Sequence, residues 1–544
     1  MVALPVIANH TTSWHDGGVA ILLPNGDVMA LAAERVGDRY KHSWDSKLAY
    51  DYLQTRLPSG YFGGVNDKFI DTRNGLETDN HHYYHATSTY FASGIEEAAV
   101  LVVDGQGPAG EHLSTTTIWD AAKGKVSLVE DISPCPPPFA STSVGHFYTA
   151  IGALAGFKGL FCEGKVMALA AYGHPSTMLD VISSYVEVSL DGLPTIDPTF
   201  TLSVLGHTLG PDLYGWPAPT DDYIDTWELL NALRRDPRPR WPTQDDMNIA
   251  YAGQYLLERV LIGLARRARA LTGRKNLCIA GGVGLNCVAN EKIRQEGLFE
   301  QVYVVPAPAD DGQALGKLYA ILAQQGIDRP ALTSPYLGPE YNNHEVYAAL
   351  SSRHDLVIWR MFNETAELIQ SVASLLSNDS VIGWFQGRSE LGPRALGHRS
   401  ILADPRNPLM RDRLNQVKGR EWFRPFAPVI KLEAVPGYFQ TNSPSPYMSF
   451  AVNGRSATRS SIAAAVHVDG TARVQTVEEK QEPRLYRLLS EFEVCTGVPV
   501  LINTSFNGRE QPIVETPEDA ISAFVSLRLD ALVIGNYIVR MRDI

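Results

Sequence analysis

The sequence predicts an α/β protein with more than one domain, and three observations indicate this fold class. First, 544 residues are enough for two to four domains of roughly 100 to 200 residues each. Second, apolar runs end in Gly or Asp turns in EEAAVLVVDGQG, NLCIAGGVGLN and QVYVVPAPADDG, and the last two lead directly into helical sequence. Third, Thr243 to Thr272 form a long amphipathic pattern that closes before Gly273. Turns from strand to helix are where α/β folds bind phosphates and other ligands.

The remaining elements follow in chain order. Two apolar runs within residues 16–33 are joined by Asn25-Gly26, which predicts a β-hairpin. Residues 184–243 are rich in Pro, Asp and aromatic residues with little periodicity, which predicts an irregular insertion. A Pro- and Gly-containing stretch at 334–345 predicts a linker, after which we expect a new helix-strand pattern to begin with VIGWFQG at 381–387. The sequence therefore predicts two domains, residues 1–340 and 341–544.

Composition excludes several classes of protein. The chain is 44% hydrophobic and 20% charged, as in ordinary globular proteins, and its net charge of −13 argues against general binding of nucleic acid. Its five cysteines include no CxxC pair, so neither a disulfide framework nor a thiolate zinc site is expected. The first residues lack the basic flank of a signal peptide, and no apolar run approaches the ~18 residues of a membrane span. We therefore expect a cytoplasmic enzyme that does not contact a membrane.

The pair His81 and His85 predicts half of a metal site, because residues four apart on a helix share one face. Asp104 ends the VLVVDG strand, and Asp310 or Asp311 opens the helix after VVPAPADDG. Two imidazoles and two carboxylates suit a divalent transition metal such as iron, manganese or zinc. For an isolated HxxxH, a polar helix with surface histidines is the alternative interpretation.

Glycine turns predict a second kind of site. The run Gly281-Gly282-Val283-Gly284, before Asn286, lies between a strand and a helix, where backbone amides can approach a phosphate. It matches neither GxxxxGK[ST] nor GxGxxG, so a tight structural turn is the alternative. Gly164-Lys165 is similar, with a solvated lysine at a helix start as its alternative. His15, beside the hairpin, is a candidate general base for a hydroxyl nucleophile, although a lone histidine is more often structural.

The segment from Arg388 to Arg424 holds eight arginines and one lysine against four acids. Arginine favours bidentate recognition of phosphate and carboxylate, so we expect this segment to bind a small dianion and the phosphates of a nucleotide. A nucleic-acid patch or a solvated basic face is the alternative, and the few interleaved aromatic residues weaken the first of these. Farther on, VPVLINTSFNG places Thr504, Ser505 and Asn507 at a strand end, where they would complete an anion pocket. A polar β-turn is the alternative for that stretch.

In combination and order, these motifs resemble those of the O-carbamoyltransferases of antibiotic and nodulation-factor biosynthesis. The resemblance covers nearly the whole chain, through HDGGVAIL, HHYYHA, VLVVDGQG, EGKVMALAAYG, AGGVGLN, SELGPRALGHRSILADPR, REWFRPFAP and INTSFNG. It implies an N-terminal actin-like ATPase domain, similar to enzymes that attach threonylcarbamoyl to tRNA. It also implies a C-terminal domain similar to threonylcarbamoyl-AMP synthases.

The resemblance also implies functional residues. The metal ligands would be His81, His85, Asp104 and Asp310, and the Lys418-x-Arg420 and Ser505-x-Asn507 pairs would mark the adenylate-forming site, with His15 as general base. In the N-terminal domain, the nucleotide or adenylate would be bound by Gly105, Gln106, Gly164, Lys165, Gly281, Gly282, Gly284 and Asn286. In the C-terminal domain, carbamoyl phosphate and ATP would be bound by Arg388, Arg394, Arg399, Lys418, Arg420, Arg424, Asn503, Ser505 and Asn507.

The activity implied by the resemblance has two steps. Carbamoyl phosphate and ATP form carbamoyl adenylate, and a hydroxyl of a natural product such as a macrolide, ansamycin or aminoglycoside then takes the carbamoyl group. The expected cofactors are Mg²⁺ with ATP and a divalent metal in the N-terminal domain, with Fe²⁺ ahead of Mn²⁺ or Zn²⁺. The insertion at 184–243 would shape the acceptor pocket. The metal identity, the acceptor and the oligomeric state stay open, with a homodimer as one option.

Five other classes of function fit the sequence less well. An actin-like kinase or ATPase would produce ADP and leaves the basic C-terminal segment unexplained. Hydrogenase-maturation carbamoyltransferases carry cysteine-rich zinc segments, and a tRNA-modifying enzyme would need a basic face. A metallopeptidase would need HExxH, which is missing. A non-enzymatic nucleotide-binding scaffold would make the pattern of Lys418, Arg420, Ser505 and Asn507 incidental.

Overall fold

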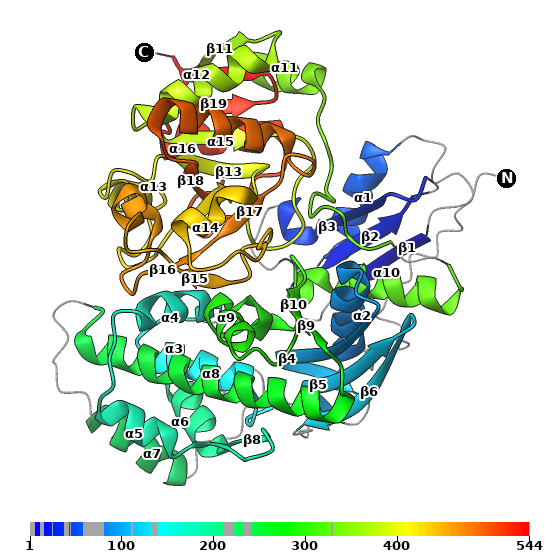
Figure 1. Ribbon diagram of the computed structural model, residues 1–544, viewed down its shortest axis with the longest axis vertical. Helices are drawn as coiled ribbons and strands as arrows, with labels where there is room; N and C mark the ends of the chain where they lie inside the picture. The colour runs from blue at the N-terminus through cyan, green and yellow to red at the C-terminus, as the bar shows by residue number, and fades with distance from the viewer. Residues whose placement is uncertain are drawn as a thin grey trace. The chain divides into compact units, whose positions relative to one another are not determined.

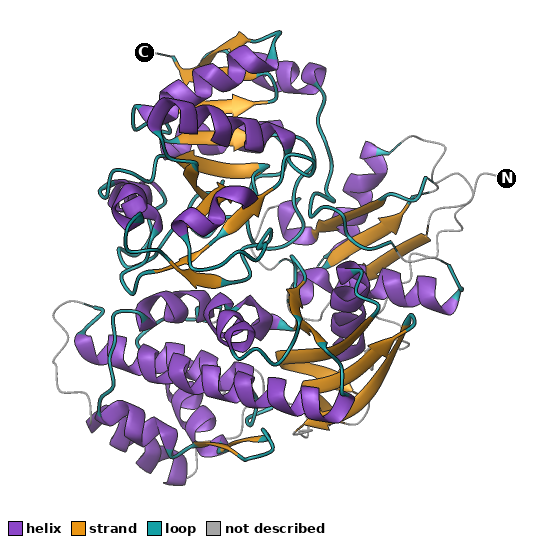
Figure 2. Ribbon diagram, in the orientation of Figure 1, coloured by secondary structure: helices purple, strands orange, loops and turns teal. Residues whose placement is uncertain are grey.

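The computed structural model describes twelve stretches of the chain and divides into two compact units. The described residues are 6–10, 16–23, 25–36, 43, 45–57, 81–109, 112–132, 140–159, 161–209, 221–232, 241–327 and 330–542. One unit combines Met1–Asp71 with Leu332–Ile544, and the other is Thr72–Ala331. Helices and strands occur in both units (Figure 1, Figure 2). The predicted α/β fold class is confirmed. No helix among the described residues is long and apolar enough to cross a membrane.

The Thr72–Ala331 unit is built on a five-stranded sheet of order β10-β9-β4-β5-β6. Strands β10 and β9 run parallel to β4, whereas β5 and β6 are antiparallel neighbours. The run Val100 to Val103 of β4 is fully buried, as its unbroken apolar sequence predicts for a central strand. The strands are β4 (Glu97–Ala109), β5 (His112–Ala122), β6 (Lys125–Ile132), β9 (Asn276–Ala280) and β10 (Gln301–Val304), with a small pair β7 (Val186–Val188) and β8 (Pro194–Ile196).

Helices contact this sheet along β4. Helix α2 packs against β4 and α10, and α3 and α8 also contact β4. The expected long helix is confirmed as α8, which Thr243 opens with a capping box and Gly273 closes in the left-handed conformation. The helices are α2 (His81–Ser93), α3 (Val144–Leu154), α4 (Glu163–Ala170), α5 (Thr177–Ser183), α6 (Pro198–Leu209), α7 (Asp221–Ala232), α8 (Gln244–Thr272), α9 (Cys287–Gln295) and α10 (Gln313–Gln324), with short 3₁₀ turns η4 (Gly282–Leu285) and η5 (Asp310–Gly312).

The prediction that residues 184–243 are irregular is wrong for the described part of that segment. It contains the β7-β8 hairpin and the helices α6 and α7. Polar side chains hide the helical period, because Thr201 and Ser203 are fully buried on α6. Of the aromatic residues noted in the sequence, Trp227 stacks on His207, and Trp241 donates a hydrogen bond of 2.9 Å to the Ala155 carbonyl. Tyr214 and Trp216 lie outside the described residues.

The other unit has an eight-stranded sheet of order β11-β20-β19-β12-β13-β18-β14-β17, a three-stranded sheet β1-β2-β3 and a pair β15-β16. The predicted hairpin is confirmed as β2-β3, and its turn contains Gly26 at a φ of 89°. The strands are β1 (Val6–His10), β2 (Gly18–Leu22), β3 (Val28–Ala32), β11 (Val357–Met361), β12 (Ile382–Phe385), β13 (Arg399–Ala403), β14 (Ala427–Lys431), β15 (Ala451–Asn453), β16 (Thr471–Arg473), β17 (Gln475–Val477), β18 (Val500–Ser505), β19 (Ala531–Ile534) and β20 (Tyr537–Met541).

The second helix-strand pattern begins earlier than expected, because α11, β11 and α12 precede the strand at 382–385. Strand β11 exposes Ile358 and Met361, so it lacks the apolar core pattern by which buried strands are recognised. The helices of this unit are α1 (Ser46–Arg56), α11 (Asn343–Ser352), α12 (Thr365–Ser377), α13 (Met410–Val417), α14 (Val435–Tyr438), α15 (Pro483–Thr496) and α16 (Pro517–Leu527), with 3₁₀ turns η1 (Ala33–Arg35), η6 (Leu432–Ala434) and η7 (Arg459–Ala465).

Arginine side chains join the first strands of the chain to its C-terminal part within this unit. Arg388 donates to the Val28 carbonyl at 2.9 Å and to the Leu337 carbonyl at 2.7 Å. Arg35, which is buried, donates to the Gly392 carbonyl at 2.9 Å. These contacts explain why residues 1–71 group with the C-terminal part. The functional division at residue 340 stays a prediction.

Candidate metal centre and anion site

Helix α2 carries the two histidines that the sequence singled out. His81 and His85 lie one turn apart, and most of the helix around them is buried. Two glycines let neighbouring elements approach this helix closely. A Cβ on Gly316 of α10 would come within 1.9 Å of the Tyr84 carbonyl oxygen, and one on Gly107 of β4 would come within 2.2 Å of the His81 ring. The helix is therefore fixed between α10 and the end of β4.

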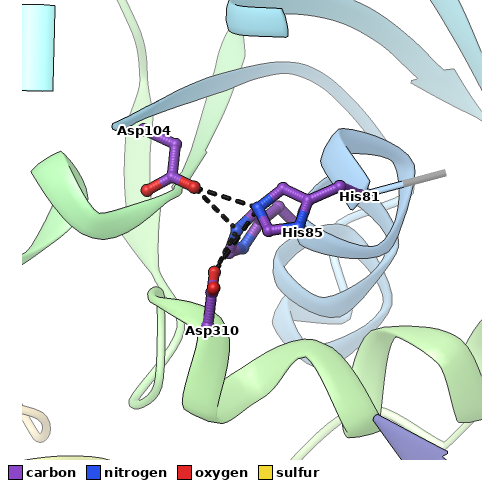
Figure 3. A group of neighbouring side chains, drawn as sticks. All are labelled: His81, His85, Asp104 and Asp310. Carbon is purple, nitrogen blue, oxygen red and sulfur yellow. Dashed lines mark hydrogen bonds and ion pairs between the residues drawn. The ribbon is translucent and has the colours of Figure 1, made fainter. Parts of the chain in front are cut away.

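Four side chains from three elements converge beside this helix (Figure 3). Asp104 comes from β4 and Asp310 from the η5 turn that opens α10. The Nε2 atom of His81 lies 3.0 Å from Asp104 Oδ2 and 3.4 Å from Asp310 Oδ1, and that of His85 lies 3.5 Å and 3.2 Å from the same two atoms. One ligand atom from each residue lies within 4.8 Å of the others, and all four residues are buried. The cluster contains Asp310 and not Asp311.

The charges of the cluster are strongly coupled. Burial alone would lower the pKa of His85, but the nearby carboxylates of Asp104 and Asp310 outweigh it and raise the pKa to about 9. Burial alone would raise the pKa of Asp104, but His81 and His85 outweigh it and hold the pKa well below its usual range. The imidazoles thus stabilise two buried carboxylates, a role that a cation at the same point would also fill.

The residues present fit a divalent metal ion. Two imidazole nitrogens and two carboxylate oxygens are borderline-to-hard donors suited to a transition metal, and no thiolate takes part. The buried Nε2 atom of His85 has no hydrogen bond of regular geometry among the described residues, although two carboxylate oxygens lie nearby. This arrangement is typical of ligands that converge on a shared ion.

The glycine run supports Asp104 directly. The Gly282 N–H donates to Asp104 Oδ1 at 2.8 Å, which orients the carboxylate. Gly281 has a φ of 87°, and a Cβ there would lie 2.2 Å from the Val103 carbonyl oxygen. The N–H groups of Gly281 and Gly284 donate to the carbonyls of Pro308 and Gly281 at 2.7 Å and 2.9 Å. All three amides predicted to contact a phosphate are thus bonded to oxygens of the protein itself, and their role in nucleotide binding stays a prediction.

The other residues predicted to bind nucleotide in this unit lie at separate places. Gly105 packs beneath His146, and the Gln106 side chain accepts from the Ala140 N–H at 3.0 Å. Asn286 caps α9 and exchanges hydrogen bonds with Gln254. Gly164 and Lys165 lie in the first turn of α4, and Gly164 faces open space. The structure therefore brings Gly105, Gly281 and Gly282 to the metal cluster, whereas Asn286 and Gln106 bond to neighbouring helices and loops. His15 lies outside the described residues.

In the other unit, a lysine and two arginines gather at the end of β18. Lys418, at the end of α13, is only 2% exposed. Its ammonium donates to the carbonyl of Ser505 and to both the carbonyl and Oδ1 of Asn507, the latter two at 2.9 Å. Three oxygens thus face its three N–H donors. Lys418 fixes the Ser505–Asn507 turn and places a positive charge beneath it.

Arg420 lies beside this turn and carries a charge that the protein does not fully balance. Its guanidinium lies 3.4 Å from Thr504 Oγ1 and 3.3 Å from Ser505 Oγ. Burial, reinforced by the charges of Arg424 and Arg473, lowers its pKa to about 9. Burial also lowers the pKa of Arg424, with Glu421 opposing it. Partly buried cations whose pKa values are lowered in this way are typical of a site that binds an anion.

The sequence did not indicate Arg473, because it lies on β16, in TARVQ, far from the basic segment between Arg388 and Arg424. Its charge lowers the pKa values of both Arg420 and Arg424, which places it with them. A single arginine in a short strand gives no signal of its own. Arg473 ends β16, which pairs with β15, two residues before β17 of the eight-stranded sheet begins.

The remaining residues predicted to bind carbamoyl phosphate and ATP contact the protein itself. Arg399 is fully buried over the Phe385 ring and donates to the carbonyls of Gln386 and Gly387 at 2.7 Å and 3.1 Å. Arg388 bonds to three carbonyl oxygens, as part of the joint between the first strands and the C-terminal part. Arg394 donates to Tyr447 O at 3.1 Å, and Asn503 donates to Ala395 O and Gln475 Oε1. The structure therefore brings Lys418, Arg420, Ser505 and Asn507 into one contact group, with Arg424 beside it.

Comparison with known proteins shows relatives along most of the chain. The family model described as Carbamoyltransferase N-terminus matches residues 46–319, and that described as Carbamoyltransferase C-terminus matches residues 373–541. The chain is 35% identical over 487 residues to the uncharacterized protein sll1178 of Synechocystis sp., covering 85% of this chain and 75% of that protein. It is 36% identical over 474 residues to Nodulation protein NolO of Bradyrhizobium diazoefficiens, covering 85% of this chain and 79% of that protein. Among solved structures, full-length HypF aligns with a TM-score of 0.34 and 15% identity, covering 60% of this chain and 57% of that one.

Proposed function

The chain belongs to the carbamoyltransferase family, and on this premise we propose that it transfers a carbamoyl group in two ATP-dependent steps. In the first step, carbamoyl phosphate and ATP give carbamoyl adenylate, pyrophosphate and phosphate, with one water molecule consumed to balance the loss of phosphate. In the second step, a hydroxyl of a natural product attacks the carbamoyl carbon, the bond to the AMP oxygen breaks and AMP leaves. The transferase activity follows from the family, and the two-step route with a natural-product acceptor is our proposal.

The observation that carries the first step is the cation group at the end of β18. Carbamoyl phosphate and ATP are anions, and pyrophosphate gains charge as it departs from the α-phosphorus. Arg420 and Arg424 are partly buried cations with lowered pKa values, and such groups stabilise developing negative charge more strongly than fully exposed ones. Lys418 acts through the turn, because its ammonium holds Ser505 and Asn507 in place. The hydroxyl of Ser505 and the guanidinium of Arg420 then face the same point.

The metal cluster supports the second step. A divalent ion held by His81, His85, Asp104 and Asp310 supplies Lewis-acid polarisation of a carbonyl and charge for an AMP phosphate. The protein's own part is orientation, since the Gly282 N–H fixes Asp104 and the surrounding burial excludes water. We propose Fe²⁺ for this ion, with Mn²⁺ and Zn²⁺ as the alternatives, and Mg²⁺ with ATP in the first step. His15 is proposed as the base that takes the proton of the acceptor hydroxyl.

The test separates AMP from ADP. Purified protein is mixed with ATP and carbamoyl phosphate, with and without a panel of hydroxylated natural products, and nucleotides and pyrophosphate are quantified. We expect AMP and pyrophosphate only when carbamoyl phosphate is present. An Arg420→Met variant should lose this turnover, whereas Arg487→Met, on the exposed face of α15, should keep it. ADP as the product would overturn the adenylate route and favour the alternative of an actin-like kinase or ATPase.

A further inference from the structure

Three polar side chains form a hydrogen-bonded group on neighbouring strands of the Thr72–Ala331 unit. His112 and Ser114 belong to β5 and Asp131 belongs to β6. Asp131 Oδ2 lies 2.9 Å from His112 Nε2 and accepts a hydrogen bond of 2.6 Å from the Ser114 hydroxyl. The His112 side chain is 42% exposed, whereas Ser114 is buried. The imidazole of His112 therefore faces solvent, and its hydrogen bond to Asp131 fixes its orientation.

The hydrogen bonds decide which ring nitrogen is available. A carboxylate accepts hydrogen bonds, so Nε2 of His112 donates to Asp131 and Nδ1 is the ring nitrogen that does not face the carboxylate. Asp131 Oδ1 is buried and has no hydrogen-bond partner among the described residues. Asp131 consequently interacts with the imidazole of His112 through Oδ2. His112 thus offers one oriented hydrogen-bond acceptor, Nδ1, to a ligand.

This group borders the metal cluster. Ser114 pairs with Gly107 across the β4-β5 ladder, and Ala109 pairs with His112. The ring of His81 lies directly on Gly107, because a Cβ there would come within 2.2 Å of it. Paired Cα atoms in an antiparallel ladder are about 4.5 to 5.5 Å apart, and two residues along a strand span about 6.6 Å. The distance from His112 to His81, a candidate metal ligand, is therefore about the length of one or two sugar rings.

We propose that Nδ1 of His112 accepts a hydrogen bond from a hydroxyl of the carbamoyl acceptor and holds that acceptor at the metal centre. The inference rests on the proposed function and adds a residue that positions an acceptor with several hydroxyl groups. With Nε2 directed at Asp131, Nδ1 is the ring nitrogen left to face a hydroxyl of that acceptor. One hydroxyl binds His112 while a second attacks the carbamoyl carbon, so His112 is a binding residue and not the base.

The test uses the whole protein and two alcohols of different size. Methyl α-D-glucopyranoside is the probe with several hydroxyls, and methanol is the probe with one. His112→Gln keeps a donor toward Asp131 but replaces the ring, so that its amide oxygen does not occupy the position of Nδ1. We expect it to raise the KM for the glucoside at least tenfold at nearly unchanged kcat, and to leave both methanol carbamoylation and carbamoyl-phosphate-dependent AMP formation unchanged. His174→Gln, at an exposed turn of the same unit, is the matched control.

A second variant separates hydrogen bonding from folding. In Asp131→Asn the amide can donate to Nε2, which moves the ring proton to Nδ1 and removes the acceptor without removing the ring. We expect the same rise in KM with unchanged thermal unfolding. The inference would be overturned if the variants lost activity equally with the glucoside and with methanol, or if neither KM changed. It would also be overturned if the unaltered protein carbamoylated methanol but not the glucoside. Absence of carbamoyl-phosphate-dependent AMP formation would instead refute the proposed function itself.

Discussion

The two candidate sites of this chain are electrostatically opposite. In the Thr72–Ala331 unit, two carboxylates and two imidazoles meet in a buried cluster. The imidazoles stabilise the carboxylates there, as a bound cation would. In the other unit, Lys418, Arg420 and Arg424 gather at a strand end, with burial and mutual repulsion lowering the pKa values of both arginines. Each site has the charge that the other lacks.

The difference between them indicates how the work is divided. A site that lacks a cation is suited to hold a metal, and a site that lacks an anion is suited to hold phosphates. Polar partners are arranged accordingly, since a backbone N–H supports Asp104 whereas oxygens hold Lys418. Loss of one site should therefore spare the partial reaction of the other, and the predictions below test that separation.

The largest effect is expected from removing a metal ligand. Asp104→Asn removes a negative charge and weakens an oxygen donor at the centre of the cluster. We therefore expect bound metal to fall to background. Carbamoyl transfer should fall by at least ~1,000-fold, because the metal no longer stabilises the charge that develops in the transition state. Adenylate formation should stay within about twofold of normal, because the cation group belongs to the other unit. Metal content is measured by elemental analysis, and partial reactions by AMP and pyrophosphate release. Asp180→Asn, on α5 of the same unit, is the control. Loss of both partial reactions would contradict the separation.

A slightly smaller effect is expected at Lys418. Lys418→Met leaves the carbonyl of Ser505 and the side-chain oxygen of Asn507 without their buried donor, and it removes a positive charge. We expect adenylate formation to fall by roughly 100- to 1,000-fold, in the range seen when one preorganised donor is lost. Metal content should be unchanged. Lys418→Arg should not restore activity, because a planar guanidinium cannot face the same three oxygens in a fully buried position. Rescue by arginine would mean that charge alone matters.

The third prediction concerns pH and anion binding at Arg420. Its pKa is lowered to about 9, chiefly by burial, from an ordinary value above 12. Because the folded state holds this proton less tightly than the unfolded state, the buried charge lowers stability below pH 9, and stability returns as pH rises from about 9 toward 12. An anion offsets that cost only while Arg420 is charged. Inorganic pyrophosphate should therefore stabilise the protein strongly at pH 7.5. Its dissociation constant should be several-fold higher at pH 9.5.

Thermal unfolding with and without pyrophosphate measures this effect. Arg420→Met should raise the midpoint of unfolding without ligand, because a partly buried charge next to Arg424 is replaced by an apolar side chain. The same variant should lose most of the pyrophosphate-dependent shift. Arg487→Met should leave both quantities unchanged, since Arg487 is exposed. A pyrophosphate effect that is constant from pH 7.5 to 9.5 would show that Arg420 does not bind the anion.

The sequence predicted the metal cluster well because its signals are local. His81 and His85 are one turn apart on a predicted helix, and Asp104 and Asp310 each end a predicted strand or open a helix. The strand ends of one sheet meet at one edge, so their side chains converge without further information. The hairpin at Asn25-Gly26 and the helix from Thr243 were predictable for the same reason.

The basic segment shows where such prediction stops. Its arginines are close in sequence, but Arg388 and Arg399 bond to carbonyl oxygens in the interior, whereas Arg420 and Arg424 face the strand end. Guanidinium groups serve as structural clamps and as anion ligands with equal ease, and composition does not distinguish the two uses. Arg473 lies on β16, outside the basic segment, and its charge acts on Arg420. The helices within 184–243 were missed because buried Thr201 and Ser203 break the apolar period.

Among substitutions at the metal cluster, the smallest effect is expected at Gly282, which touches the cluster without contributing a ligand. Its N–H orients Asp104 Oδ1, and a Cβ at this position would lie 3.0 Å from the same oxygen. Gly282→Ala should push the carboxylate by a few tenths of an ångström and weaken metal binding by about tenfold, the lower end of the range for changes to a group that orients a ligand. Gly206→Ala, which faces open space on α6, should leave metal binding unchanged. Competition with a metal-sensitive chelating dye measures both affinities. Equal affinities in the two variants would show that the glycine run serves only the packing of the strand end, and that Asp104 is held by its imidazole partners alone.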